Sequence, residues 1–254
     1  MPETLLLTLY NRAVESQRPD AIIRDEQAVE LVQRLDYDFR RFGRGHASHP
    51  IRARVMDDIL HSFLARHPDA VVINLGAGLD TQFFRVGNAS VRWYEIDLPE
   101  SIALRRQFFT ENERYQFVAG SVGGDAERMD LVPPDTPLMV LAAGLLMYFT
   151  ADEVKRLITT LAERFPGAEM QFDTITRWFS NQSLVGKARL PGGFVLPPMP
   201  WGINGNQITQ ITTWHPAIKI VQARDYTIGY RRRWGVYGHI GAPPIRYQTD
   251  FEYM

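Results

Sequence analysis

The chain has 254 residues and a formal net charge of −1, a balance that excludes the strongly basic surface typical of nucleic-acid-binding proteins and any attraction to anionic membranes. Hydrophobic residues make up 45% of the chain, which excludes disorder, and no run approaches the roughly 20 apolar residues that cross a bilayer. The absence of cysteine excludes disulfides, thiolate metal sites and a cysteine nucleophile, and we expect a reducing, cytoplasmic location.

The first seventy residues have the periodicity of helices. Apolar residues recur at helical spacing in two stretches, Ala28, Leu31, Val32 and Leu35 and then Val55, Ile59, Leu60 and Phe63. We therefore expect residues 1–69 to form a helical N-terminal cap.

From residue 70 onward, short β-branched runs alternate with amphipathic segments, which is typical of an α/β fold with a mostly parallel sheet. Helices are predicted over 99–112 and 151–165, and the second begins with Thr150 as N-cap and Glu153 three residues later. Strands are predicted near 70–75, 91–97, 115–119, 137–143, 168–173 and 217–224.

We expect one domain spanning residues 1–254. Its cofactor-binding core covers 70–173, and a substrate cap with the last strands covers 174–240. Segment 186–206 is rich in glycine and proline, and a loop of this length is usually functional or mobile, so we place it over the active site as a lid or substrate wall.

The most informative motif is an apolar run that leads into Gly76-Ala77-Gly78 and Asp80. Glycine lets the backbone approach a ligand, and Asp97 follows about 20 residues later, at the end of the next strand, where an acid suits a ribose diol. The pattern predicts a site for an adenosine-containing cofactor. Glu95 shares a strand face with Asp97, although a solvated strand residue is its simpler interpretation.

A dinucleotide fingerprint would place a third glycine where this chain has Thr81. In dinucleotide-binding folds that glycine lets the helix pack closely against the strand next to the pyrophosphate. Its absence weakens the case for a pyrophosphate ligand. S-adenosylmethionine, which has no phosphates, therefore fits better than a nicotinamide dinucleotide, and a nicotinamide-dependent oxidoreductase remains as the enzymatic alternative.

Several motifs together resemble the leucine carboxyl methyltransferase family, in particular its bacterial branch of polyketide O-methyltransferases. They are the segments 74–81 and 94–99, the pair Phe84-Arg85, the run Gly144-Leu145-Leu146-Met147-Tyr148-Phe149 and the pair Phe172-Asp173. The resemblance implies a Rossmann-like class I methyltransferase with a seven-stranded, mostly parallel sheet flanked by helices. It also implies S-adenosylmethionine as the methyl donor.

The resemblance assigns two basic residues to the donor's carboxylate, Arg12 near the N-terminus and Arg52 before the glycine turn. A guanidinium can pair two N–H groups with a carboxylate. The other expected donor contacts are Gly76, Ala77, Gly78, Asp80, Thr81, Glu95, Asp97, Leu98, Ser121, Ala143 and Gly144.

Two positions depart from the family pattern. Ala143 stands where the family usually has a glutamate that would help to place the cationic end of the donor, unless another acid such as Asp80 substitutes. Ser121 lies where the family often has an acidic residue near the adenine. The first departure keeps open a methyltransferase-like protein that binds ligand without turnover.

The expected reaction is transfer of a methyl group to an oxygen of a small, aromatic or polyketide-like molecule. A carboxylate needs no general base because it is ionised near neutrality, whereas a phenol would be helped by one, with Tyr148 or His215 as candidates. Expected substrate contacts are Met147, Trp178, Phe194 and Trp214, although such residues can equally pack the cap. We expect no metal, no nucleic-acid or membrane partner, and leave a homodimer open.

Overall fold

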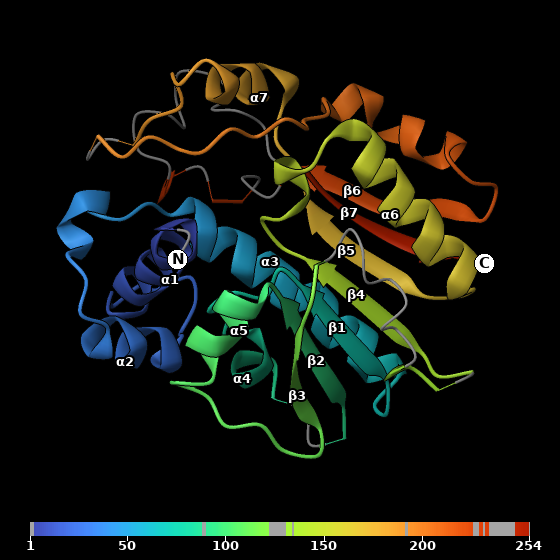
Figure 1. The fold of residues 1–254 in the computed structure, drawn as a ribbon, viewed down its shortest axis with the longest axis horizontal. Helices are drawn as coiled ribbons and strands as arrows, with labels where there is room; N and C mark the ends of the chain where they lie inside the picture. Colours follow the sequence, from blue (N-terminus) through green and yellow to red (C-terminus); the bar gives the residue numbers. More distant parts are fainter. Residues whose placement is uncertain are drawn as a thin grey trace.

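The computed structural model describes residues 3–87, 90–121, 131–133, 135–190, 193–225, 229–230, 232–233 and 247–253. Four helical elements precede the sheet, as the periodicity predicts: α1 (Glu3–Ser16), α2 (Glu26–Arg34), the 3-10 turn η1 (Phe39–Phe42) and α3 (Ser48–Arg66). In Figure 1, α1 and α2 lie together at one side of the sheet, beside the ends of its central strands.

The sheet has seven strands in the order β3-β2-β1-β4-β5-β7-β6. The first five in this order are parallel to their neighbours, whereas β7 is antiparallel to both β5 and β6. The strands are β1 (Val71–Leu75), β2 (Arg92–Asp97), β3 (Tyr115–Ala119), β4 (Leu138–Ala142), β5 (Glu169–Asp173), β6 (Ile218–Asp225) and β7 (Tyr247–Tyr253). The predicted Rossmann-like α/β class is confirmed, and six strands lie where the sequence places them; β7 was not predicted.

The remaining described helices connect the strands. They are α4 (Gln82–Val86), α5 (Pro99–Arg105), η3 (Leu146–Tyr148), α6 (Ala151–Arg164), α7 (Arg177–Leu184) and η4 (Gly205–Thr213). Helix α6 begins with the predicted capping box, in which Thr150 and Glu153 satisfy each other's backbone N–H groups.

The predicted helix over 99–112 is too long. Helix α5 ends at Arg105, because Asn112 turns the chain back toward β3. Its side-chain oxygen accepts hydrogen bonds from the N–H groups of Arg114 and Tyr115, which a helix through residue 112 would not allow.

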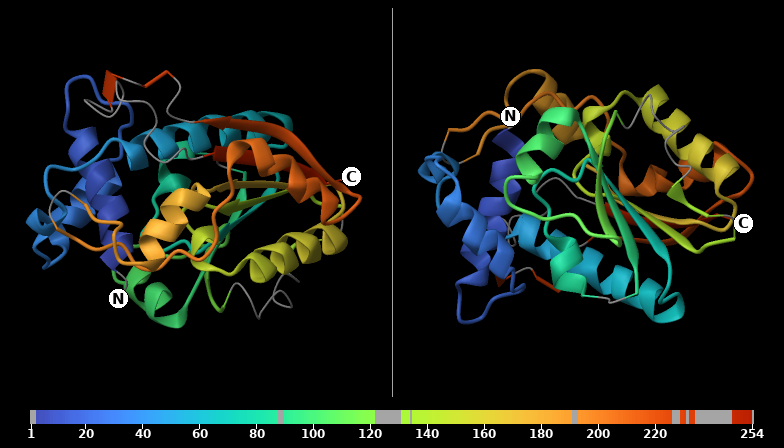
Figure 2. Two further views of the ribbon diagram at one scale, coloured as in Figure 1. Left: turned by 90° about the horizontal axis from the view of Figure 1, so that it is seen from above. Right: turned by 60° about the horizontal axis from the view of Figure 1, so that its bottom comes forward.

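Apolar side chains cover both faces of the sheet, and β1 and β4 are buried along their whole length, as expected for central parallel strands. One core cluster joins α6 and η4 to the sheet, and the other joins α1, α2, α3, α4 and α5 to it. Figure 2 shows α3 and α6 on opposite faces. This leaves the carboxyl ends of the strands as the edge where ligands bind in open α/β sheets. The interpretation of the whole chain as one domain stays a prediction.

Candidate active site

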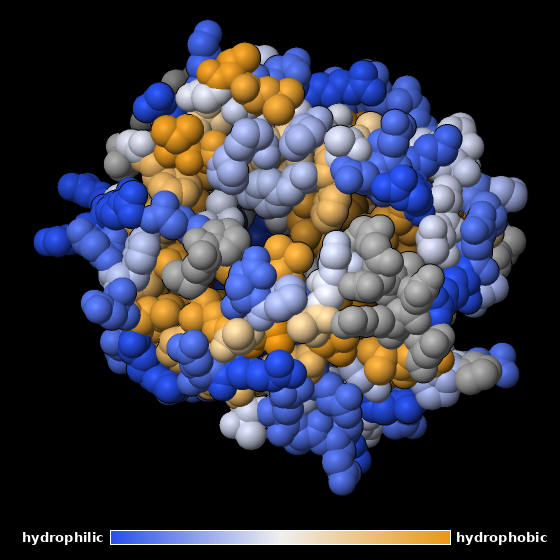
Figure 3. All heavy atoms as spheres, in the orientation of Figure 1, coloured by the Kyte–Doolittle hydropathy of each residue, from blue (hydrophilic) through white to orange (hydrophobic). Residues whose placement is uncertain are grey.

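A cavity of about 1410 Å³ opens where β1, β2 and β4 end. It exceeds the volume of roughly 300–1,000 Å³ that a single small ligand usually occupies, so it has room for two ligands. Of the predicted site residues, thirteen line it: Arg12, Arg52, Gly76, Ala77, Asp80, Asp97, Leu98, Ser121, Ala143, Gly144, Met147, Tyr148 and Trp178. In Figure 3, apolar side chains surround a hollow near the middle of one face.

The glycine turn and Asp97 are joined directly. The Asp97 carboxylate accepts hydrogen bonds from the N–H of Gly78 at 2.6 Å and from the N–H of Leu98 at 2.7 Å. Burial raises the pKa of Asp97, and these N–H groups and Ser101 counteract the rise. Because each carboxylate oxygen accepts more than one hydrogen bond, Asp97 can still take hydroxyl donors from a ligand in the cavity.

Both glycines of the turn are needed for steric and conformational reasons. Gly76 and Gly78 have φ of 64° and 49°, in the left-handed region that disfavours side chains. A Cβ on Gly76 would lie 2.6 Å from a methyl group of Leu145, and one on Gly78 would collide with Leu5. The turn therefore exposes backbone to the cavity and leaves no room for a side chain.

Behind the turn lies a buried carboxylate, Asp25, on which three donors converge. Its Oδ2 accepts from Arg12 Nε at 2.8 Å, from Arg85 Nη1 at 3.0 Å and from the Thr81 hydroxyl at 2.6 Å. Its Oδ1 caps α2 through the N–H of Ala28 at 2.9 Å. Burial alone would raise the pKa of Asp25, but Arg12 and Arg85 hold it below its usual value of 3.8.

Arg85 extends this cluster to α3 by a bidentate pair with Asp57, at 2.8 and 3.1 Å. Asp80 lies 3.6 Å from Arg85 and 3.8 Å from Arg12. Burial alone would raise the pKa of Asp80, but the two arginines hold it below its usual value, so it is an anion at the wall of the cavity.

Arg52 is held on the other side of the cavity by Asp173, the last residue of β5, at 3.1 Å. The other oxygen of Asp173 accepts the N–H of Gly144 at 2.5 Å. A Cβ on Gly144 would lie 2.6 Å from Arg52 Nη1, so this glycine lets the guanidinium pass over the backbone after β4. Arg12 and Arg52 thus flank the glycine turn, each with its charge balanced by a buried aspartate.

Ala143 leaves the cavity without the glutamate of the family pattern. Among the described lining residues the only carboxylates are Asp80 and Asp97. Asp80 is therefore a candidate to balance a cationic ligand at this end.

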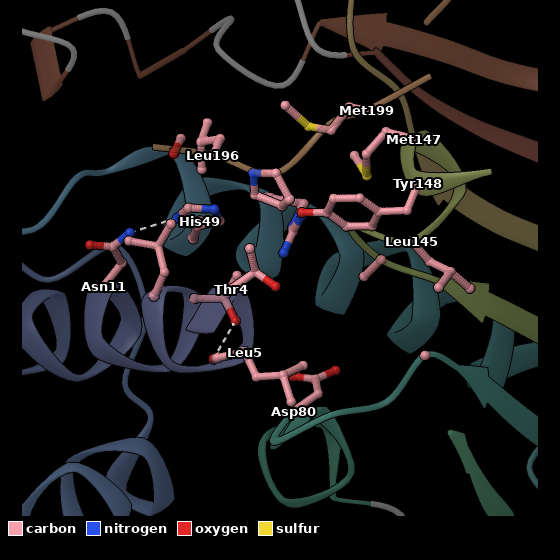
Figure 4. Close-up of a pocket in the computed structure, with 18 of the residues that line it drawn as sticks. Thr4, Leu5, Asn11, His49, Asp80, Leu145, Met147, Tyr148, Leu196 and Met199 are labelled. Carbon is pink, nitrogen blue, oxygen red and sulfur yellow. Dashed lines mark hydrogen bonds between the residues drawn. The ribbon is translucent and has the colours of Figure 1, made fainter. Parts of the chain in front are cut away.

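The remaining walls are mainly apolar. Figure 4 shows Tyr148 pointing into the cavity between Met147 and Met199 on one side and Asp80 and Leu5 on the other. Tyr148 is 38% exposed and Trp178 61% exposed, and both line the cavity.

Three residues of the cofactor prediction lie behind the wall rather than on it. Glu95 is fully buried in an ion pair with Arg105 at 2.6 Å and a hydrogen bond with Asn74 at 2.8 Å, and burial raises its pKa to about 7. Thr81 is buried against Asp25, and Gly78 is covered by Leu5. These residues support the site without lining it.

Three predicted substrate or catalytic residues are also absent from the lining. Phe194 packs edge-on against Phe42 at 5.3 Å between ring centroids. Trp214 packs against the core beside α6. His215 lies just before β6, where its Nδ1 accepts the N–H of Ala217, so it is placed to end a turn and not to act as a base in the cavity.

Sequence reasoning did not single out several polar residues of the cavity, among them His49 and Gln82. His49, at the start of α3, lines it, and its Nδ1 lies 2.6 Å from the Asn11 amide nitrogen. Gln82, the first residue of α4, is buried, lines the cavity, and its amide nitrogen has no hydrogen-bond partner among the described residues. Gln82 comes shortly after the predicted glycine turn, and this position in the sequence was the signal that could have identified it as a site residue.

These features fit S-adenosylmethionine. A carboxylate on the ligand would complete the unpartnered amide nitrogen of Gln82 and would be attracted by the guanidinium groups of Arg12 and Arg52, which line the cavity. Ribose hydroxyls suit Asp97, and a cationic centre suits Asp80. The side chains of the site do not call for a metal ion. Among the described residues, no group of three or more histidine or acidic side chains could hold one. Nor does any helix in the described part of the chain combine the length and apolarity of a membrane crossing.

Residues 6–162 match the family model for leucine carboxyl methyltransferases. The chain is 35% identical to the tetracenomycin polyketide synthesis O-methyltransferase of Streptomyces glaucescens, over 69% of this chain and 66% of that protein. It is 32% identical to an S-adenosyl-L-methionine-dependent methyltransferase of Gibberella zeae, over 67% of this chain and 65% of that one.

This chain belongs to the leucine carboxyl methyltransferase family. The predicted family is confirmed, and S-adenosylmethionine is the methyl donor of such enzymes. The match spans slightly less than two thirds of the length of both relatives. The crystal structure of a putative methyltransferase from Thermobifida fusca shares the fold, with a TM-score of 0.58 at 13% identity over 99% of this chain and 98% of that one.

Asp25→Asn removes the charge at the centre of the cluster and keeps its size and its capping oxygen. We expect a loss of about 3–5 kcal/mol in the free energy of unfolding at neutral pH. Arg12 then keeps only Asp80, at 3.8 Å, as a counter-charge, and the new amide NH2 group faces the donors of Arg12, Arg85 and Thr81. Since the folded-state pKa of Asp25 is lowered, its contribution is complete above pH 3.8 and is lost as the pH falls below that value.

Urea denaturation measures both effects. Glu30→Gln, which breaks an exposed pair with Arg34, is the matched control and should change stability by less than about 0.5 kcal/mol. Equal stability of Asp25→Asn and Glu30→Gln would contradict the role given to the cluster.

Proposed function

We propose that this protein transfers a methyl group from S-adenosylmethionine to an oxygen atom of a small, largely apolar molecule, with a carboxylate as the favoured acceptor. The observation that carries this proposal is the glycine turn bonded to Asp97 at one end of a cavity too large for the donor alone. Membership of the family and the name of the Streptomyces relative support it.

The residues at the strand ends divide the work of holding the donor. Asp97 would accept the ribose hydroxyls, and the backbone of Gly76 and Ala77 would lie against the donor. Arg12, Arg52 and Gln82 would bind the carboxylate, and Asp80 would balance the cationic centre in place of the missing glutamate. Leu98 directly follows Asp97, and Ser121 follows Gly120, whose N–H bonds to the carbonyl of Asp97 at 2.9 Å; both line the cavity and would flank the adenine.

When bound, the donor supplies an electrophilic methyl group. The protein's contribution is to bring the acceptor oxygen into line and to exclude water, and orientation of this kind can contribute roughly 7–11 kcal/mol. Met147, Tyr148 and Trp178 would form the apolar surface that holds the acceptor. A carboxylate is ionised near neutrality and needs no proton acceptor.

A phenol is the second candidate acceptor, because His49 and the Tyr148 hydroxyl line the same cavity. The Asn11 amide beside His49 Nδ1 fixes the orientation of the imidazole. Because the Asn11 amide nitrogen donates to Nδ1 and its oxygen accepts the N–H of His46, the neutral imidazole of His49 carries its proton on Nε2. His49 is therefore a candidate to donate a hydrogen bond to the acceptor oxygen and not to act as a general base. Tyr148 would orient the acceptor in either case.

We expect the demethylated donor, S-adenosylhomocysteine, to bind at micromolar strength in isothermal titration calorimetry. Asp97→Asn should weaken this binding about 10- to 100-fold, because hydrogen bonds to a charged group contribute about 1.5–3 kcal/mol. Asp58→Asn, which changes an exposed aspartate of α3, is the control and should bind as the wild type does. Binding of a nicotinamide dinucleotide in its place would contradict the proposal.

Transfer of labelled methyl to panels of aromatic acids and phenols identifies the acceptor. For a carboxylate, kcat should be flat from about pH 6 to 9, and His49→Gln should lower it less than about tenfold. A phenol acceptor would instead give a kcat that rises with pH toward about 10, where a phenol ionises. Absence of transfer to every compound would favour a ligand-binding protein without turnover.

A further inference from the structure

The charged side chains that line the cavity differ at its two ends. The inner end, formed by the residues that follow β1, β2 and β4, contains Asp80 and Asp97. The three arginines at this end are already paired, Arg12 with Asp25, Arg52 with Asp173 and Arg85 with Asp57. A cationic donor is therefore matched to the inner end.

The outer end, formed by segments 43–49 and 187–190, is basic. Arg44, Lys187 and Arg189 line it, and all three are exposed. None of them has an acidic partner among the described residues, and no described carboxylate lines this end. Three unbalanced cations near one opening repel one another, and an anion between them relieves that repulsion.

The fold holds these cations on two segments that are packed together. Segments 188–190 and 194–196 run antiparallel, with Leu190 N–H bonded to Phe194 O and Leu196 N–H bonded to Ala188 O, both at 2.9 Å. Phe194 then packs on Phe42, just before Arg44. The ring pair thus ties the segment that carries Arg189 to the segment that carries Arg44.

Between the two ends the walls are apolar. Met147, Tyr148, Leu196 and Met199 line this part, and Figure 4 shows Met147, Leu196 and Met199 across the cavity from Asp80, with the Tyr148 ring between. A ligand that spans the acceptor part of the cavity would place an apolar body here and reach the basic opening at its outer end.

We propose that the outer end is a subsite for an anion, and that the substrate is an apolar aromatic acid with a negatively charged group remote from the oxygen that is methylated. Arg44, Lys187 and Arg189 bind that group, and the acceptor oxygen lies in the apolar part beside Tyr148, where it faces the donor. This inference rests on the proposed function, since it assigns the inner end to the donor.

Two probes with the same ring system separate charge from apolar contact: 1-anilinonaphthalene-8-sulfonate and its neutral counterpart N-phenyl-1-naphthylamine. Each is titrated by fluorescence into protein saturated with S-adenosylhomocysteine. In the double variant Lys187→Gln/Arg189→Gln, the Kd of the sulfonate should rise roughly threefold for each cation removed and about tenfold in all, while that of the neutral probe changes less than about twofold. High salt should weaken sulfonate binding to the wild type more than binding to the variant, which keeps only Arg44 of the three cations.

The matched control is Lys155→Gln/Arg177→Gln, which removes one lysine and one arginine from exposed positions outside the cavity and should bind both probes as the wild type does. Equal losses for the two probes, an unchanged sulfonate Kd, the same loss in the control, or no binding of either probe would each overturn the anion subsite. Calorimetry of S-adenosylhomocysteine with the same variants tests the donor site separately, because these substitutions should leave that binding unchanged.

Discussion

The geometry of this site depends on one buried carboxylate. Asp25 is 1% exposed, and a charge so placed is stable only when it is fully paired. Its partners come from α1 through Arg12, from the glycine turn through Thr81 and from α4 through Arg85. Satisfying one carboxylate therefore requires three parts of the chain to meet in one arrangement.

That requirement explains why the donor end is formed before any ligand arrives. Arg12 is oriented by Asp25, and Arg52 is oriented in the same way by Asp173, so neither guanidinium has to be ordered on binding. Preorganised groups of this kind lower the cost of association. The arginine that a ligand meets is held by an aspartate that the ligand does not touch.

The cavity also sorts its ligands by charge. Asp80 and Asp97 face one end, and Arg44, Lys187 and Arg189 surround the other. A cationic donor and an anionic acceptor would then each be repelled from the wrong end. Apolar residues separate the two ends and provide the water-poor region in which a methyl transfer is favoured.

The sequence was sufficient for the parts of the fold that depend on local pattern. The apolar runs predicted β1 to β6, and Thr150 with Glu153 predicted the start of α6. Strand β7 was missed even though Tyr247, Thr249, Phe251 and Tyr253 alternate with polar residues, which is the period of a strand. That signal was present and overlooked.

Other parts of the site could not be predicted from spacing. Asp25 meets Arg85 across 60 residues of chain, and nothing in the segment around residue 25 distinguishes it from an ordinary helix cap. Glu95 and Asp97 share a strand face, yet only Asp97 reaches the cavity, because Arg105 lies over Glu95. His215 and Phe194 were chosen by residue type, and type alone does not reveal which side of a cap faces the ligand.

Amide hydrogen exchange tests the central claim that Asp25 couples these segments. If it does, Asp25→Asn should speed exchange together in peptides covering α1 and in those covering residues 76–86, although the two are far apart in the chain. Saturation with S-adenosylhomocysteine should restore part of the protection in both. Faster exchange confined to the first turn of α2, with α1 and residues 76–86 unchanged, would contradict the account.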